Sequence, residues 1–219
     1  MSDFLKNLNS VLPLYECILP FSKKKVFFTP FKVKDAKNIS IIIQEENKQL
    51  VIQTLVDLLK NCCKDIDPLD LCLADAEYLF MMIRSKSVEE NLNLIVNGKS
   101  VKVSIYDIKA KNELKSSELK ISGNLILKIE TPTLKDLLKF SDVTKKEVTL
   151  ASIKQVTLNK EIYTVDTFVS NEVEELLNNL PLNVMNEIEK INQPQLSLTI
   201  KTDTEESEVS GILSFFILR

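Results

Sequence analysis

The dipeptide Asn97-Gly98 stands between two segments in which apolar and polar residues alternate, residues 91–96 and 101–108. An Asn-Gly pair readily adopts the positive φ angles of a two-residue turn, and the twist of that turn matches the right-handed twist of the flanking strands. The pair therefore predicts a β-hairpin, and with it an antiparallel strand pair.

Other segments predict a mixture of strands and helices. Aromatic and β-branched residues predict a strand over residues 25–34, and apolar residues at three- and four-residue steps predict a helix over residues 48–62. Asp75 is expected to cap a helix over residues 76–85. Further strands are expected over residues 119–130, 148–158, 161–165, 195–201 and 209–218, and further helices over residues 131–140, 167–180 and 182–191.

These strands and helices come in groups rather than in strict alternation, which is typical of the α+β class. We expect antiparallel hairpins packed with several short amphipathic helices. A polar stretch at residues 141–146 separates an N-terminal α+β region, residues 1–140, from a C-terminal α+β region, residues 141–219. One continuous domain is the alternative to this division.

The composition argues against an enzyme. The chain has no histidine, which excludes Ser-His-Asp and Cys-His arrangements and histidine-bound metals. Its three glycines, Gly98, Gly123 and Gly211, lie too far apart for a P-loop or a GxGxxG motif. We therefore expect no catalytic residue and no cofactor. A hydrolase built on paired glutamates is an alternative, and it would need two carboxyl groups about 5 to 10 Å apart.

The charge balance is mildly acidic, with 28 Lys and Arg residues against 31 Asp and Glu residues. Only Arg84 and Arg219 are arginines, and the dense basic run from Lys23 to Lys25 is short for binding DNA by counterion release. We expect no nucleic-acid binding and interpret the run as a solvated segment before a strand. A DNA-associated accessory protein with a lysine-rich surface is the alternative function.

The four cysteines, Cys17, Cys62, Cys63 and Cys72, show no Cys-x-x-Cys spacing. The N-terminus lacks the features of a signal peptide, and no apolar run approaches the roughly 20 residues that span a bilayer. We therefore expect a protein of the reducing cytoplasm with free thiols, no bound metal and no membrane contact.

Three phenylalanines surround Pro30 in the first expected strand: Phe27, Phe28 and Phe31. Because proline cannot donate a hydrogen bond to a ladder, this strand should lie at an edge or carry a bulge. An aromatic edge strand must be covered, either by this chain or by a partner protein. We expect this chain to cover Phe28 and a partner to cover Phe31.

The expected helix over residues 76–85 adds two candidates. Tyr78 is expected to pack against the core, and Arg84 is expected to pair with Glu77 or Asp75. The candidate partner-binding residues are Phe28, Pro30, Phe31, Tyr78 and Arg84.

Several segments together resemble a known family. The most specific is residues 73–89, which contain Asp-x-Glu-Tyr-Leu-Phe-x-x-Ile-Arg-Ser-Lys-Ser. With residues 28–35, 129–134, 180–189 and 211–216, this block resembles the baseplate hub assembly proteins of T-even-type contractile-tailed bacteriophages.

The resemblance implies a viral tail protein without chemical catalysis, which acts in the host cytoplasm with other baseplate hub proteins as partners. It leaves open whether the protein stays in the virion or acts only as an assembly chaperone. The exact partner, the stoichiometry and any homo-oligomerisation also stay open.

Overall fold

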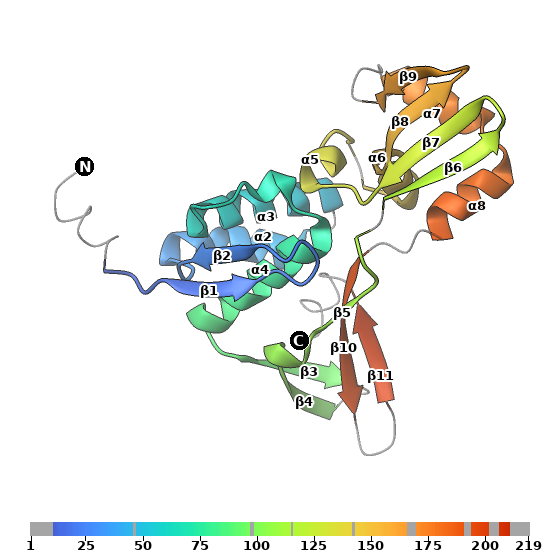
Figure 1. The fold of residues 1–219 in the computed structure, drawn as a ribbon. Coiled ribbons are helices and arrows are strands. Elements are labelled where there is room, and N and C mark those ends of the chain that lie inside the picture. The colour runs from blue at the N-terminus through green and yellow to red at the C-terminus, as the bar shows by residue number, and fades with distance from the viewer. Residues whose placement is uncertain are drawn as a thin grey trace.

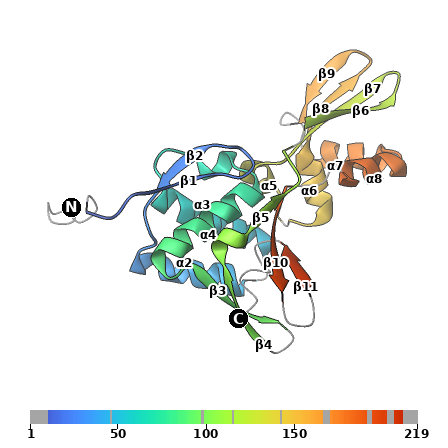
Figure 2. The same cartoon turned by 60° about the horizontal axis from the view of Figure 1, so that its bottom comes forward.

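The computed structural model describes residues 11–210 except residues 46, 97–98, 115, 142, 166–169, 191–193 and 202–205. It combines helices with antiparallel strand pairs, so the predicted α+β class is confirmed. Figures 1 and 2 show a helical lobe, a lobe built on a sheet, and strands β10 and β11 beside the hairpin β3–β4.

The helical lobe contains the first elements of the chain. They are β1 (Tyr15–Ile18), β2 (Lys25–Phe28), the short helix η1 (Val33–Asp35), α2 (Ala36–Gln44), α3 (Lys48–Cys62), η2 (Pro68–Asp70) and α4 (Leu73–Ser87). The prediction for residues 48–62 is confirmed as α3, which begins after Asn47, whose side chain accepts a hydrogen bond from the Leu50 N–H.

The strand predicted over residues 25–34 is shorter than expected. It ends at Phe28, before Pro30, and the chain then turns into η1. The turn is stabilised by Asp35, which is buried and accepts a 2.8 Å hydrogen bond from the Lys32 N–H. The proline and this local bond together end the strand earlier than its aromatic composition indicates.

Helix α4 also begins earlier than predicted, and Asp75 is not its cap. Cys72 occupies the N-cap position, and Asp75 lies inside the first turn with no exposed surface. Its carboxylate accepts hydrogen bonds from the backbone N–H groups of Phe21, at 3.0 Å, and Ser22, at 2.8 Å. The carboxylate therefore holds the loop between β1 and β2 rather than the end of its own helix.

The predicted hairpin is confirmed by the pairing of β3 (Asn91–Val96) with β4 (Lys99–Ser104), in which Val96 lies opposite Lys99. The Asn97-Gly98 turn itself lies outside the described residues. The second strand ends at Ser104 rather than at residue 108, because the Ser104 hydroxyl accepts the Tyr106 N–H and starts η3 (Ile105–Asp107).

Strands from distant parts of the chain complete the helical lobe. A sheet in the order β11-β10-β5 combines β5 (Lys109–Lys111) with β10 (Gln195–Lys201) and β11 (Glu206–Ser210). Leu196, Leu198 and Ile200 of β10 are almost fully buried in the same core as α3 and α4. The prediction of a strand over residues 209–218 falls almost entirely on residues outside the described part of the chain.

The sheet lobe contains strands in the order β6-β7-β8-β9, with helices against one face (Figures 1 and 2). The strands are β6 (Ser116–Ser122), β7 (Leu125–Glu130), β8 (Ile153–Leu158) and β9 (Glu161–Thr164), and the helices are α6 (Lys145–Ser152), α7 (Ser170–Asn179) and α8 (Leu182–Lys190). A second hydrophobic core lies between this sheet and its helices, and it includes Leu127, Val156 and Ile188.

Two strand predictions in this lobe are corrected. Residues 119–130 form parts of two strands, because the chain turns at Gly123 and Asn124. Residues 148–152 are helical rather than extended, as the end of α6. The Thr149 and Ser152 hydroxyls donate to carbonyls four positions earlier, so these buried polar side chains are satisfied inside the helix.

Helix α5 (Leu134–Leu137) connects the two lobes. It begins after Thr133, inside the segment where a helix was expected to start, and ends at Leu137 rather than near residue 140; the Leu134 N–H donates to the Leu71 carbonyl of the helical lobe. The Asp136 carboxylate accepts hydrogen bonds from Thr133 and from Lys154, which lies in β8 of the sheet lobe. Asp136 therefore links an element packed on the helical lobe to the sheet lobe.

The division at residue 140 stays a prediction. Strands from both sides of this position share two sheets, because β7 pairs with β8 and β5 pairs with β10.

Candidate functional site

The candidate residues fall on two sides of α4. Tyr78 and Phe80 are two positions apart on the helix and point to opposite sides. Phe31 packs on Phe80, with ring centroids 5.2 Å apart. Tyr78 lies on the other side, near Cys17 of β1 and Tyr106 of η3. Burial raises the pKa of the Tyr78 phenol, and these two neighbours raise it further.

Phe28 and Pro30 belong to a segment that the chain itself closes. Phe28 has no exposed surface, and its ring centroid lies 5.9 Å from that of Tyr15. The edge of β2 away from β1 is occupied, because the Thr29 N–H donates to the Cys62 carbonyl and the Phe27 N–H donates to the Asp65 carboxylate. This edge offers no place for a partner strand.

Phe31 is half-buried at the end of α4. Its N–H donates a 2.8 Å hydrogen bond to the Ser87 hydroxyl, which in turn donates to the Ile83 carbonyl. Beside these two bonded residues lie two very exposed apolar side chains, Val33 with 94% of its surface accessible and Val88 with 72%. We call the group Phe31, Val33, Arg84, Ser87 and Val88 the Phe31 face.

Arg84 does not pair as predicted. One nitrogen of its guanidinium lies 3.5 Å from the Glu89 carbonyl, to which it donates, and the Val88 N–H donates to the Arg84 carbonyl. Burial lowers the pKa of Arg84. The negative charge of Glu89 acts in the opposite direction but does not cancel this effect. Since Glu77 precedes Arg84 by two helical turns and Asp75 is bound to the β1–β2 loop, the pairing goes instead to the residues after α4.

A second cluster was not predicted from the sequence. Lys86 donates to the Glu90 carboxylate at 2.6 Å and to the Tyr106 hydroxyl at 2.9 Å, and that hydroxyl donates to Glu90 at 3.0 Å. The Lys86 ammonium also lies 5.8 Å from the ring centroid of Tyr15. The only local signal is the four-residue spacing of Lys86 and Glu90, since the two tyrosines come from distant segments.

The Lys86 cluster holds the end of α4 against β1 and η3. The hydrogen bonds that Lys86 donates to Glu90 and Tyr106 raise the pKa of Lys86, and the hydrogen bonds that Glu90 accepts from Lys86 and Tyr106 lower the pKa of Glu90. The pair is therefore charged at neutral pH and screened by solvent, so its role is positioning more than stabilisation.

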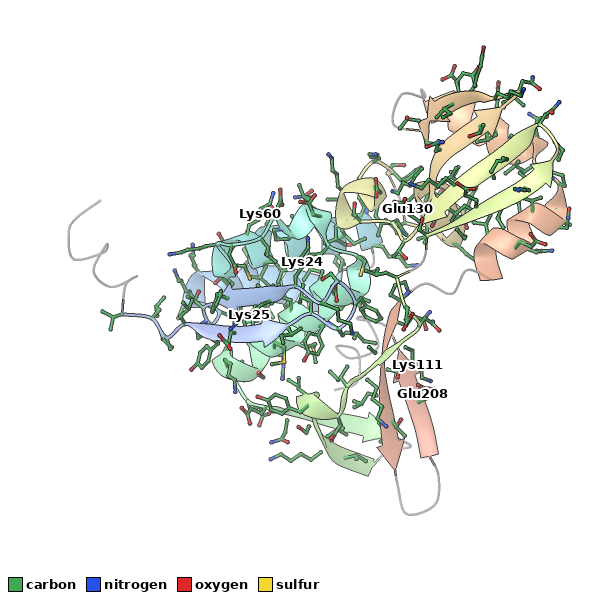
Figure 3. All side chains as sticks on the ribbon, viewed as in Figure 1. Lys24, Lys25, Lys60, Lys111, Glu130 and Glu208 are labelled. Atoms are coloured by element: carbon green, nitrogen blue, oxygen red, sulfur yellow. The ribbon has the colours of Figure 1, made fainter. Side chains whose placement is uncertain are left out.

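The basic run is largely engaged within the chain. Lys23 adopts a positive φ of 59° and donates to the Pro20 carbonyl, while Lys25 forms a 2.8 Å ion pair with Glu16. Figure 3 shows Lys24 and Lys25 beside the strand pair β1–β2. This arrangement gives no support to the alternative of a DNA-associated protein.

The cysteines are free thiols buried in the helical lobe. Burial raises the pKa of Cys17 to about 11 and those of Cys62 and Cys72 to about 12, and it raises the pKa of Cys63 as well. Such thiols stay protonated and are poor nucleophiles and poor metal ligands. In the described part of the chain, no group of three or more Cys, Asp or Glu side chains is arranged to hold a metal ion.

Residues 12–217 match the model of a protein family described as T4 bacteriophage base plate protein. The chain belongs to this family. The match extends through both lobes of the baseplate protein and confirms the resemblance seen in the sequence, at the level of the baseplate. No curated protein and no solved structure matches the chain. Among the described helices of the baseplate protein, none combines the length and apolarity needed to cross a bilayer.

Proposed function

We propose that this baseplate protein is a non-enzymatic part or assembly factor of the central baseplate hub, and that it acts through protein–protein contacts in the host cytoplasm. The observation that carries the proposal is the family match over residues 12–217. A protein that works in a multiprotein assembly needs surface that a partner can cover.

The Phe31 face supplies such surface. Val33 and Val88 expose most of their side chains, and the hydrogen bond between Phe31 and Ser87 fixes the two segments that carry them. Burying an exposed valine contributes about 1.5 kcal/mol or more to association. Arg84, beside these side chains, adds a polar group at the rim, which is typical of protein interfaces.

The test combines a gene deletion with surface variants in an infecting phage. Deletion of the gene should stop baseplate assembly, and Val33→Asp with Val88→Asp should reduce the yield of complete baseplates at least tenfold. The matched control is Ile162→Asp, which changes an apolar residue of the sheet lobe that is 66% exposed, close to the 72% of Val88. All variants should melt within 2–3 °C of the unaltered protein, since roughly 1 kcal/mol shifts Tm by about 2–4 °C at this size.

Complete baseplates formed without the protein would overturn the proposal. Normal baseplate assembly with the Val33 and Val88 variants would show that the Phe31 face is not the partner-binding surface. Mass spectrometry of purified particles separates a hub subunit, which leaves abundant peptides, from a chaperone, which leaves none.

A further inference from the structure

A groove of about 480 Å³ lies between the hairpin β3–β4 and strand β10. Val103 and Ile200 supply buried apolar surface to it, and its rim carries exposed polar groups. The rim residues on which the argument rests are Lys102, Tyr106, Asp107 and Lys109. None of the sequence-predicted candidates lines this groove.

One side of the groove is the edge of β4 that faces away from β3. The Ile105 N–H donates to the Glu90 carbonyl, so these two residues form a hydrogen-bonded pair at the base of the hairpin. Hydrogen-bonded pairs alternate with non-bonded pairs in an antiparallel ladder. Lys102 therefore occupies a non-bonded position, and its N–H and C=O point away from β3. Among the described strands, only β3 pairs with β4.

On the opposite side, the edge of β10 beyond Ser197 that faces away from β11 pairs with no other described strand. Strand β5 pairs with β10 only through Gln195–Ser197, after which β10 continues to Lys201 with β11 as its neighbour on one side. Thr199 and Ile200 line the groove along this stretch, which β5 does not reach. Open strand edges present unpaired backbone donors and acceptors, which an extended segment can satisfy.

The charges at the rim favour an acidic occupant. Lys102 and Lys109 are exposed, and within the described residues neither makes an ion pair. The neighbouring Lys111, by contrast, is paired with Glu208 on β11 (Figure 3). Among the described residues that line the groove, Asp107 is the one acid against Lys102 and Lys109, so these residues carry a net positive charge.

We propose that this groove binds an extended segment of another baseplate protein by strand addition, and that Lys102 and Lys109 pair with a carboxylate of that segment. Backbone pairing gives such a complex its register, and the side-chain pockets give it specificity. The inference rests on the proposed function, because it names the kind of segment through which a hub partner binds.

The test places a photo-crosslinking amino acid, p-benzoylphenylalanine, at Asp107 of the full chain in infected cells. The same amino acid at the exposed Glu113 serves as the position control. We expect a crosslink from position 107 to a stretch of another baseplate protein that contains Asp or Glu, identified by mass spectrometry. The double variant Lys102→Glu and Lys109→Glu should lower the crosslink yield at least tenfold, and lysine in place of the partner carboxylate should restore it.

The charge control is the double variant Lys37→Glu and Lys120→Glu, which reverses two exposed lysines away from the groove and should leave the yield unchanged. A crosslink only to this chain or to a second copy of it would overturn the inference. So would an undiminished yield with both groove lysines reversed, or no crosslink while baseplates form. If baseplates require this protein but still form with the groove variants, the inference about the groove is wrong and the proposed function stands. If baseplates form without this protein, the proposed function is wrong.

Discussion

The Asp75 carboxylate in α4 accepts a 3.0 Å hydrogen bond from the backbone N–H of Phe21, a residue 54 positions earlier. Its second oxygen accepts the neighbouring Ser22 N–H at 2.8 Å. One side chain thus replaces the water that the loop between β1 and β2 loses when the core covers it. Hydrogen bonds to a charged group contribute about 1.5 to 3 kcal/mol each, and an unpaired buried N–H is costly.

Asp75→Ala should therefore lower the free energy of unfolding by about 2 to 4 kcal/mol, because it leaves the buried Phe21 N–H without an acceptor. Urea denaturation measures the change. Asp57→Ala is the control, since Asp57 is exposed on α3 and bonds only to Gln53 among the contacts described, and it should change stability by less than about 0.5 kcal/mol. Equal effects of the two variants would contradict the role assigned to Asp75.

A series of three phenylalanine variants should separate core from surface. Phe28→Ala should cost about 3 to 5 kcal/mol because Phe28 is fully buried, and Phe31→Ala about 1 to 2 kcal/mol because its half-buried ring still packs on Phe80. Phe27→Ala should cost less than about 1 kcal/mol, since 39% of Phe27 is accessible. Chemical denaturation of the three variants gives the order, and a smaller loss at position 28 than at 31 would refute it.

Asp136 should make stability depend on pH in the acid range. Burial raises its pKa, but hydrogen bonds from Lys154 and Thr133 outweigh burial and lower the pKa to about 2. A carboxyl group with a depressed pKa stabilises the fold at pH values above its ordinary pKa, near 3.8, and this contribution is lost as the pH falls through the lowered pKa of about 2.

At pH 6 the Asp136→Asn variant should accordingly be less stable than the unaltered protein by about 1 to 2 kcal/mol. The difference should shrink to a few tenths of a kcal/mol at pH 2, where about half of the Asp136 carboxyl groups in the folded protein are protonated. Denaturation curves from pH 6 to pH 2 measure it. A difference that stays constant over this range would show that the charge of Asp136 contributes nothing.

The four thiols should resist alkylation in the folded protein. Their raised pKa values and their burial leave almost no thiolate at pH 8. Iodoacetamide should modify none of the four within an hour under native conditions and all of them in 8 M urea, as intact mass would show. Rapid modification of the native protein would mean that the core around Cys17 opens.

Features set by local sequence were predictable. Helix α3 was predicted to the residue, because apolar residues at three- and four-residue steps mark its buried side. Helix α4 was placed only roughly, because most of its side chains are buried all round and no polar side marks its start. Asp75 was interpreted as a cap, since caps and long-range acceptors use the same residue types.

The candidate site depended on contacts that no local pattern contains. The bond between Phe31 and Ser87 joins residues 56 positions apart, and the Lys86 cluster takes one tyrosine from β1 and another from η3. The groove needs β10 to lie beside β5, which alternation in either segment does not indicate. The family could be recognised from the sequence because the resemblance depends on the order of residue types in α4. It does not depend on which residues those side chains contact in the fold.

The position of β10 between β5 and β11 has a consequence for synthesis on the ribosome. Gln195 pairs with Lys111, so at about 5 to 20 residues per second the nascent chain waits roughly 4 to 17 s between making one and making the other. During this interval the helical lobe lacks Leu196, Leu198 and Ile200, which fill its core. A polypeptide terminated before residue 195 lacks these three side chains, so the apolar surface that they cover in the complete chain stays exposed to solvent.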